Sequence, residues 1–289
     1  MERIGIIAGY GQYPILLTRE LKRSGYEVFA LCIAGQTDRT MAELADRSLW
    51  IGFGNFGKAV RFLRKHKVPQ VTMAGGAVKR HFHQPMMIWR HLPDWYTIRL
   101  FAPHFIFRTK DCSVDSLLLT CVDAFERYGI HVVPGTDLAP ELLVKRELMT
   151  KRAPNNAQWK DIQFGWKIAK EMGRLDIGQT ITVKDQSIVA IEALEGTDEC
   201  ILRSGNLCRG FTVVKVAKPQ QDMRFDLPTF GMKTIQNIVQ AGGKVLAIES
   251  GRSIFVGHED VIEFANKNGI AIVGLLDEDV QQEEYEGKK

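Results

Sequence analysis

Residues 3–76 alternate short apolar stretches with glycine turns and amphipathic stretches, which leaves few folds open to this chain. The first apolar stretch, RIGIIA, ends in Gly9 and Gly11, and a helical pattern of leucines follows it. Strands that alternate with helices at this spacing predict a parallel sheet covered by helices. The expected strands are 3–8, 26–33, 69–76 and 130–133, and the expected helices are one from about 15 to 21 and those at 55–67 and 113–129.

The second half of the chain predicts a different arrangement. Two apolar stretches at 179–185 and 187–196 follow each other like the strands of a hairpin, so the order of strands and helices is mixed. The fold class is therefore α/β, with a parallel-sheet domain at 1–140 and a mixed α+β domain at 155–280. A polar, proline-containing connection predicts the linker at about 137–158, and the charged tail from Asp277 is expected to be mobile. Further strands are expected at 211–217, 244–250 and 269–274, with helices at 159–172, 231–241 and 258–268.

Charge and cysteine content exclude several classes of protein. Lysine and arginine exceed aspartate and glutamate by 38 to 34, and this small excess is spread along the chain, so we expect no nucleic-acid partner. The five cysteines include no C-x-x-C pair, which fits a reducing cytoplasm. No stretch approaches the roughly 20 apolar residues of a membrane span.

The glycines after the first strand allow two interpretations. Gly9 and Gly11 permit a tight strand-to-helix turn, and they also permit the backbone to approach a phosphate at a helix N-terminus. The third glycine of a dinucleotide fingerprint is absent, since Tyr13 and Pro14 stand there, and no acidic residue follows the second strand. NAD binding is therefore less favoured than either interpretation.

The segment 82–107 interleaves aromatic side chains and methionines with basic residues. One interpretation is a pair of core helices or a dimer surface. The other is a cleft for fatty chains or a shallow membrane contact, in which arginines meet anionic head groups. His81 and His83 have the spacing of metal ligands, but a surface or structural pair is favoured because no third ligand is evident nearby.

Acidic residues gather where the strands of the second half end. Three segments, 175–179, 190–199 and 221–226, place carboxylates beside glycines and apolar strands. Surface acids at strand ends are common for any one segment, but three within about fifty residues favour a site. A hard cation such as magnesium takes oxygen ligands, and a phosphate bound to it would account for the basic neighbours Arg203, Lys215, Lys218 and Arg224.

These motifs carry a resemblance to a known family. The segments GRLDIGQ (173–179), AIEALEGTDE (190–199) and KPQQDMRFDLPTFG (218–231), with the opening IGIIAGYGQYP and the segment GNFGKAVRFLR, resemble the LpxI-type UDP-2,3-diacylglucosamine pyrophosphatases of lipid A synthesis. The resemblance implies a two-domain hydrolase, with a Rossmann-like domain at 1–140 and a catalytic α+β domain at 155–280, that encloses a lipid nucleotide-sugar substrate between its domains. It also implies dependence on Mg²⁺, with Mn²⁺ as the alternative ion, attack at the β-phosphorus, and UMP and 2,3-diacylglucosamine 1-phosphate (lipid X) as products.

Site residues follow from this resemblance and from the motif chemistry. The catalytic aspartate of the family lies in D-L-P-T, which is Asp226 here. We hypothesise that magnesium is held by Asp226 with help from Asp222, Glu195 or Asp198. The rigid, proline-containing loop would hold these groups in place. The expected substrate-binding residues are Gly9, Gly11, Gln179, Thr197, Lys218, Gln221 and Arg224.

The sequence also leaves open two functions other than hydrolysis. A nucleotide-sugar or lipid-binding module without catalysis would retain ligand and release no product. A nucleotide-sugar oxidoreductase would need a nicotinamide pocket. The expected location is cytoplasmic, and contact with the inner membrane and a homodimer are both left open.

Overall fold

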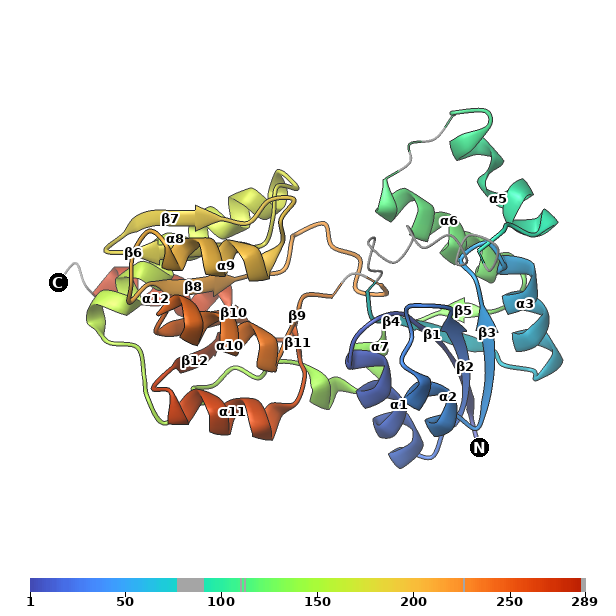
Figure 1. Cartoon of the computed structure of the whole chain (residues 1–289), viewed down its shortest axis with the longest axis horizontal. Helices are drawn as coiled ribbons and strands as arrows, with labels where there is room; N and C mark the ends of the chain where they lie inside the picture. The colour runs from blue at the N-terminus through green and yellow to red at the C-terminus, as the bar shows by residue number, and fades with distance from the viewer. Residues whose placement is uncertain (77–90, 110, 112, 226, 287–289) are drawn as a thin grey trace. The chain divides into compact units, whose positions relative to one another are not determined.

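The computed structural model describes residues 1–76, 91–109, 111, 113–225 and 227–286 of the chain. It divides into two compact units, Met1–Pro140 and Glu141–Lys289, and each is described by itself (Figure 1). The expected fold class is confirmed in both units, since the first holds an all-parallel sheet and the second a mixed one.

The first unit is built on a five-stranded parallel sheet in the order β3-β2-β1-β4-β5. The strands are β1 (Arg3–Ala8), β2 (Glu27–Ile33), β3 (Arg47–Ile51), β4 (Gln70–Ala74) and β5 (His131–Val132). The helices are α1 (Tyr13–Arg23), α2 (Arg39–Leu44), α3 (Phe56–Lys65), α5 (Trp95–Phe105), α6 (Val114–Arg127) and α7 (Gly135–Leu138). This strand order is that of a Rossmann-like fold, and its order reverses between β1 and β4.

Glycines at that reversal are required by close packing. A Cβ on Gly9 would lie 2.5 Å from the carbonyl oxygen of Gly76, which follows β4. The Gly9 amide donates to Ala74, and Tyr10 and Gly76 form an isolated bridge. The interpretation of a tight turn therefore holds for Gly9, and Gly11 has a φ of +106° with open space where a Cβ would stand.

The second unit carries a five-stranded sheet in the order β12-β10-β8-β6-β7. Its strands are β6 (Thr180–Lys184), β7 (Ser187–Ile191), β8 (Thr212–Lys215), β10 (Val245–Glu249) and β12 (Ala271–Leu275). Strands β8, β10 and β12 are parallel, and β6 is antiparallel to both β8 and β7. The expected hairpin is present, and Asp185 and Gln186 make its turn with φ of 50° and 56°.

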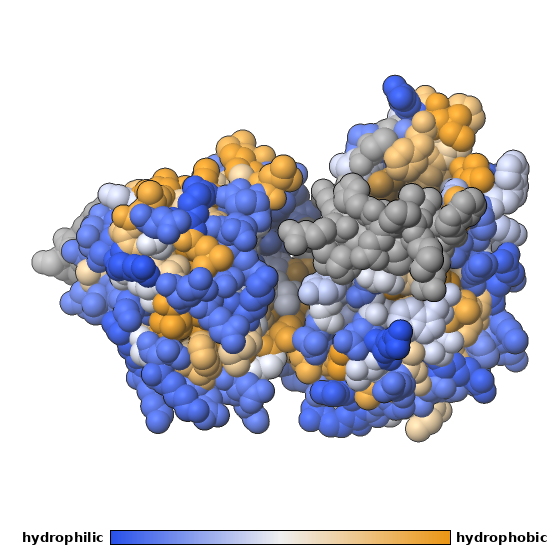
Figure 2. Space-filling view, viewed as in Figure 1, coloured by the Kyte–Doolittle hydropathy of each residue, from blue (hydrophilic) through white to orange (hydrophobic). Residues whose placement is uncertain are grey.

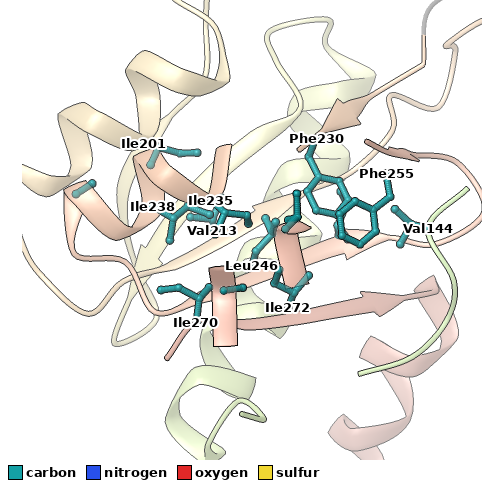
Figure 3. Packing of buried hydrophobic residues seen from close by; sticks show 14 of the residues in the cluster. Val144, Ile201, Val213, Phe230, Ile235, Ile238, Leu246, Phe255, Ile270 and Ile272 are labelled. Carbon is teal, nitrogen blue, oxygen red and sulfur yellow. The ribbon is translucent and has the colours of Figure 1, made fainter. Parts of the chain in front are cut away.

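Alternation along the strands of this sheet builds a core on each face. Val213 and Leu246 point to one face, where they pack with Ile235 and Ile238 of α10 (Met232–Ala241) (Figure 3). Their neighbours point to the opposite face, where Trp166 of α8 (Asn156–Arg174) packs. The remaining elements are the 3-10 turn η2 (Pro140–Leu142), the helices α9 (Thr197–Gly205), α11 (His258–Lys267) and α12 (Asp277–Glu286), and the small pair β9 (Thr229–Phe230) and β11 (Ile254–Phe255).

Two segments that were expected to be a linker and a mobile tail form contacts or regular structure, and mobility of the tail stays a prediction. The expected linker belongs largely to the second unit, since Leu143 bridges to Ile254, Leu148 bridges to Val273, and Val144 is buried. The tail is helical from Asp277 to Glu286. In both cases the segment has an apolar or charged partner far away in sequence, which local composition does not reveal.

The face of the chain drawn in Figure 2 is mostly polar and carries several hydrophobic patches. Figure 2 shows such a patch on the first unit in the region of α5. Among the described residues, none of the helices combines the length and the hydropathy that crossing a bilayer takes.

Candidate functional site

Strand register brings the acidic motifs of the second unit to one edge of its sheet. Lys215 at the end of β8 pairs with Thr180 on one side and with Ile248 on the other. Glu249, the residue after Ile248 on β10, therefore lies at the same edge as Lys215. Glu192 lies there too, because its amide donates to the Thr180 carbonyl. Because this is the carboxyl edge of the three parallel strands, it is also the edge where open α/β sheets bind ligands.

Lys215 is the central residue of this edge. Its side chain is 4% exposed, and its Nζ donates to Thr197 Oγ1 over 2.9 Å. Burial lowers the pKa of the Lys215 amine, whereas the charges of Glu192 and Asp198 oppose that change. An anion that reached this amine would favour its protonated form, because opposite charge offsets the cost of burying the ammonium.

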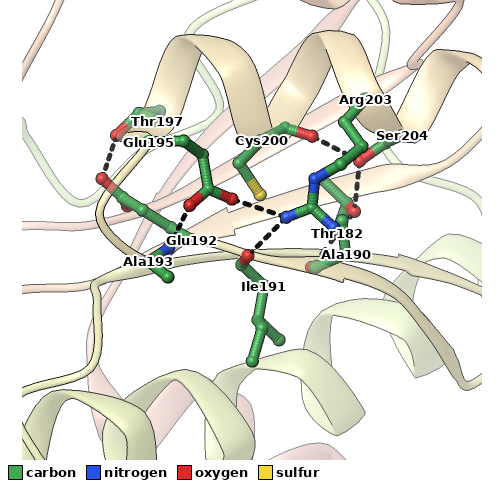
Figure 4. A network of polar contacts seen from close by, with 10 residues as sticks. All are labelled: Thr182, Ala190, Ile191, Glu192, Ala193, Glu195, Thr197, Cys200, Arg203 and Ser204. Atoms are coloured by element: carbon green, nitrogen blue, oxygen red, sulfur yellow. Dashed lines mark hydrogen bonds and ion pairs between the residues drawn. The ribbon is translucent and has the colours of Figure 1, made fainter.

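Glu192 completes the buried cluster. Thr197 Oγ1 donates to Glu192 Oε1 over 3.0 Å, as Figure 4 shows, and lies 3.2 Å from Thr180 Oγ1. The Glu192 side chain is 7% exposed, and its Oε2 has no hydrogen-bond partner among the described residues. Gln179 Oε1 is likewise buried without a partner in this part of the chain. The cluster thus offers one amine donor on Lys215 and one spare acceptor on Glu192, so it can bind a ligand that carries both a phosphoryl oxygen and a hydroxyl or amide group.

Close backbone approach explains the glycine of the first motif. A Cβ on Gly178 would lie 2.2 Å from the carbonyl oxygen of Glu192, so the segment 173–179 can meet β7 only with glycine there. The first motif also contacts the third one. Lys218 Nζ lies 2.6 Å from Asp176 Oδ1, and Gln220 Nε2 donates to the Gly173 carbonyl over 2.7 Å. The three segments that the sequence suggested as parts of one site therefore meet.

The loop of the third motif is held by its own side chains. Gln221 is buried, and its Oε1 accepts from the Lys218 amide over 3.0 Å. Arg224 donates to both carboxylate oxygens of Asp222, with the shortest contact at 2.6 Å. This hydrogen-bonded guanidinium holds the pKa of Asp222 below its usual value despite partial burial. These contacts give the loop a defined conformation up to Phe225. Asp226, the predicted catalytic residue, lies outside the described residues, as do His81 and His83.

The other predicted metal ligands do not converge in the part of the chain that the structure describes. Glu195 contacts Arg203 at 2.6 Å (Figure 4), Asp198 contacts Lys233 at 2.8 Å, and Asp222 is held by Arg224. Within the described ranges, no group of three or more histidine, cysteine, aspartate or glutamate side chains could hold a metal ion. These residues therefore do not fit a resident magnesium ion, and a ligand set that includes Asp226 stays a prediction.

Glu192 was absent from the predicted site residues, and Lys215 was predicted only as a basic neighbour of a bound phosphate. Each had a signal in the sequence. Lys215 is the one charged residue within the apolar stretch FTVVKVA, and Glu192 directly follows the stretch SIVAI. A charge within or beside a strand that is otherwise buried needs a partner, so it marks a site. Glu249 has the same signal, and its carboxylate accepts from the Ala217 amide and contacts Lys170.

Comparison with known proteins relates the whole chain to one family. The LpxI N-terminal domain matches residues 3–142, and the LpxI C-terminal domain matches residues 145–273. The chain belongs to the LpxI family. The predicted resemblance is therefore confirmed, and the match of one domain to each unit extends it over both.

Individual relatives differ in how much of the chain they share. The UDP-2,3-diacylglucosamine pyrophosphatase LpxI of Caulobacter vibrioides is 28% identical over 95% of this chain and 98% of its own length. The bifunctional purine biosynthesis protein PurH of Anaeromyxobacter dehalogenans is 30% identical, but over only 45% of this chain and 23% of its own. Among solved structures, the match to glycinamide-RNase-transformylase T of Mycobacterium tuberculosis covers 63% of this chain and 38% of that one, at 11% identity and a TM-score of 0.28.

Proposed function

We propose that this LpxI-family chain hydrolyses the pyrophosphate bond of UDP-2,3-diacylglucosamine in lipid A biosynthesis, in the cytoplasm. The proposal rests above all on the match of LpxI domains to both units. The contacts of the first motif with the second and the third motif in the second unit add support. The relative from Caulobacter vibrioides, whose name states this activity, supports it over nearly the whole length of both chains.

The buried cluster suggests roles for its own side chains. Lys215 would donate to a phosphoryl oxygen, and the spare acceptors on Glu192 and Gln179 would accept from hydroxyl or amide groups of the substrate. Lys218 and Arg224 would steady the remaining phosphoryl oxygens. Because these two cations already contact Asp176 and Asp222, substrate would have to compete with those ion pairs.

The proposed reaction is attack of water at the β-phosphorus. A bond forms between the water oxygen and this phosphorus, the bond to the bridging oxygen breaks, and UMP leaves with that oxygen. Hydrolysis in ¹⁸O-labelled water should therefore label the sugar phosphate, as mass spectrometry of the two products would show. Label in UMP would instead place the attack at the α-phosphorus.

Incubation of the purified chain with UDP-2,3-diacylglucosamine and assay for UMP tests the proposal directly. Asp226→Ala should lower turnover by at least about 10²-fold, because it removes the predicted catalytic carboxylate that is also the predicted metal ligand. Unchanged thermal unfolding would show that the variant folds. Retained substrate without UMP from the wild-type chain would favour the binding module, and tight NADH binding would favour the oxidoreductase.

Dependence on magnesium is proposed separately, because the described carboxylates do not form a metal site. A divalent ion would neutralise charge on the diphosphate. We expect EDTA to abolish UMP release and MgCl₂ or MnCl₂ to restore it. Full activity after dialysis against EDTA would remove the ion from the proposal and leave the proposed hydrolysis intact.

A further inference from the structure

Helix α5 fully buries two polar side chains and leaves several large apolar ones exposed. Its buried residues are Thr97 and His104. Thr97 Oγ1 donates to the Gly54 carbonyl over 2.6 Å, and His104 Nε2 lies 2.9 Å from Thr120 Oγ1. A helix that serves only the core of its own unit usually buries its large apolar side chains, so the exposed ones on α5 call for an explanation.

The apolar side chains of α5 and the residues that follow it face solvent. Trp95 is 73% exposed, Phe105 58%, Ile106 61% and Phe107 68%. Tyr96 and Ile98 are also exposed. Single exposed apolar residues are common, but a group of large ones on one short segment marks an interaction surface (Figure 2).

Helix α5 packs closely against α3, and this contact places basic side chains of α3 beside Tyr96. A Cβ on Gly57 would lie 2.8 Å from the Tyr96 ring and from the Asp94 carboxylate, so glycine in α3 allows the start of α5 to approach closely. Tyr96 then lines a cavity of about 540 Å³ with a set of mainly basic α3 side chains and one further aromatic ring. The lining residues are Gly57, Val60, Arg61, Arg64, Lys65, Tyr96 and Tyr128.

The charge of the two segments has one sign. Residues 56–67 contain five lysines and arginines, residues 95–109 contain two arginines, and neither segment contains an aspartate or glutamate. A second copy of the chain on this face would bring the same cations against each other, since a twofold interface is made of the same surface on both copies. An anionic surface is complementary to it.

We propose that α5, the residues up to Phe107 and the basic cavity beside them form a docking surface for an anionic lipid leaflet. The exposed apolar side chains enter the boundary between head groups and acyl chains, and the α3 cations contact lipid phosphates. Tyr96 and Trp95 suit the interface, where one end of an aromatic side chain is apolar and the other is hydrated. The inference deepens the proposed function, because a diacylated substrate resides in such a leaflet, but it does not depend on catalysis.

Vesicle flotation of the full chain tests the proposal. The wild-type chain should bind vesicles of phosphatidylcholine mixed with phosphatidylglycerol, should bind phosphatidylcholine alone at least about tenfold more weakly, and should be released by salt. Arg61→Glu with Arg64→Glu should weaken binding to the mixed vesicles by at least about tenfold, since each cation near an anionic surface contributes. Trp95→Ala with Phe107→Ala should reduce binding without altering its dependence on salt.

A matched control separates local charge from net charge. Lys151→Glu with Lys160→Glu makes the same change in charge at exposed positions of the second unit and should leave vesicle binding unchanged. Equal binding of all variants, or equal binding to both kinds of vesicle, would overturn the docking surface. So would a wild-type dimer in light scattering that Arg61→Glu with Arg64→Glu converts to monomer.

Hydrolysis of substrate dispersed in detergent micelles distinguishes failure of this inference from failure of the proposed function. Release of UMP without vesicle binding would overturn the docking surface alone. Vesicle binding without release of UMP would overturn the proposed hydrolysis alone.

Discussion

Lys215 lies at the centre of the candidate site, so its replacement tests the site most directly. Lys215→Met keeps much of the volume of the side chain but removes the donor to Thr197. If the amine stabilises a phosphoryl oxygen, turnover should fall by about 10²–10³-fold, the range found when one preorganised donor is removed. UMP release measures this effect, and Lys160→Met at an exposed position of α8 should retain full activity as the control. Wild-type turnover in Lys215→Met would remove the amine from the proposed mechanism.

The lowered pKa of Lys215 also predicts how stability depends on pH. Above the folded-state pKa and below the ordinary value of 10.5, the amine is neutral in the folded chain and protonated in the unfolded chain. The unfolded state then binds more protons, so stability rises with pH across this window and levels off above it. The free energy of unfolding of the wild type minus that of Lys215→Met, from urea titrations, should therefore increase from neutral pH to about pH 10. A constant difference would show that burial does not perturb the amine.

Individual contacts in the site could be predicted from the sequence only in part. Convergence of the segments 173–179, 190–199 and 218–231 followed from charges placed beside apolar strands. The ion-pair partners of single carboxylates could not be predicted from the sequence. Glu195 contacts Arg203 on helix α9, and Asp198 contacts Lys233 on helix α10. Such pairs depend on strand register and helix packing, which motif spacing does not contain.

Elements with long apolar patterns were predicted well, and short or charged ones were not. Strand β1 and helix α3 agree with their expected ranges to within about two residues, the usual uncertainty of element ends. Helix α2 has only 6 residues, and helix α12 has few apolar ones, so neither has a strong periodic pattern. Whether such short or charged segments form helices depends on their tertiary contacts.

Helix α12 has identifiable anchors at its N-terminus. Asp277 accepts from Trp166 Nε1 over 2.7 Å, and Asp279 accepts from the Leu276 amide over 2.8 Å and from Arg146. Carboxylates in a first helical turn satisfy free amides and complement the helix dipole. Asp279→Asn should therefore lower the free energy of unfolding by about 1 kcal/mol at neutral pH in urea titrations.

The advantage of Asp279 over asparagine should depend on pH. Burial acts to raise the pKa of Asp279, but hydrogen bonds from Arg146 and the Leu276 amide outweigh it and hold this pKa below its ordinary value. The stability that the carboxylate contributes is thus fully present above the unfolded-state value and is lost as pH falls through the folded-state pKa. The difference between wild type and Asp279→Asn should shrink between about pH 5 and pH 2. A difference that grows on acidification would contradict the assigned contacts.

At the scale of the whole molecule, the division into Met1–Pro140 and Glu141–Lys289 places the segment that was expected to be a linker within the second unit. The Val144 amide donates to the Ser253 carbonyl over 2.9 Å, and the Met149 amide donates to the Ile272 carbonyl over 3.0 Å. Thr150 Oγ1 accepts from the Ile272 amide over 2.9 Å. The segment thus satisfies backbone groups of both the loop after β10 and strand β12.

Two fragments of the chain test this placement. The fragment 141–289 retains these contacts and should unfold in one cooperative urea transition followed by circular dichroism. The fragment 155–289 begins at the boundary expected from composition. It lacks Thr150, so the Ile272 amide loses its partner, and it lacks Val144, so the core residues that Val144 covers become exposed. Each lost hydrogen bond costs about 1 kcal/mol and the lost burial of the Val144 side chain costs about 1.5–3 kcal/mol, so the shorter fragment should be less stable by at least about 3 kcal/mol. Equal unfolding midpoints with equal denaturant dependence would show that residues 141–154 connect the two units without stabilising the second.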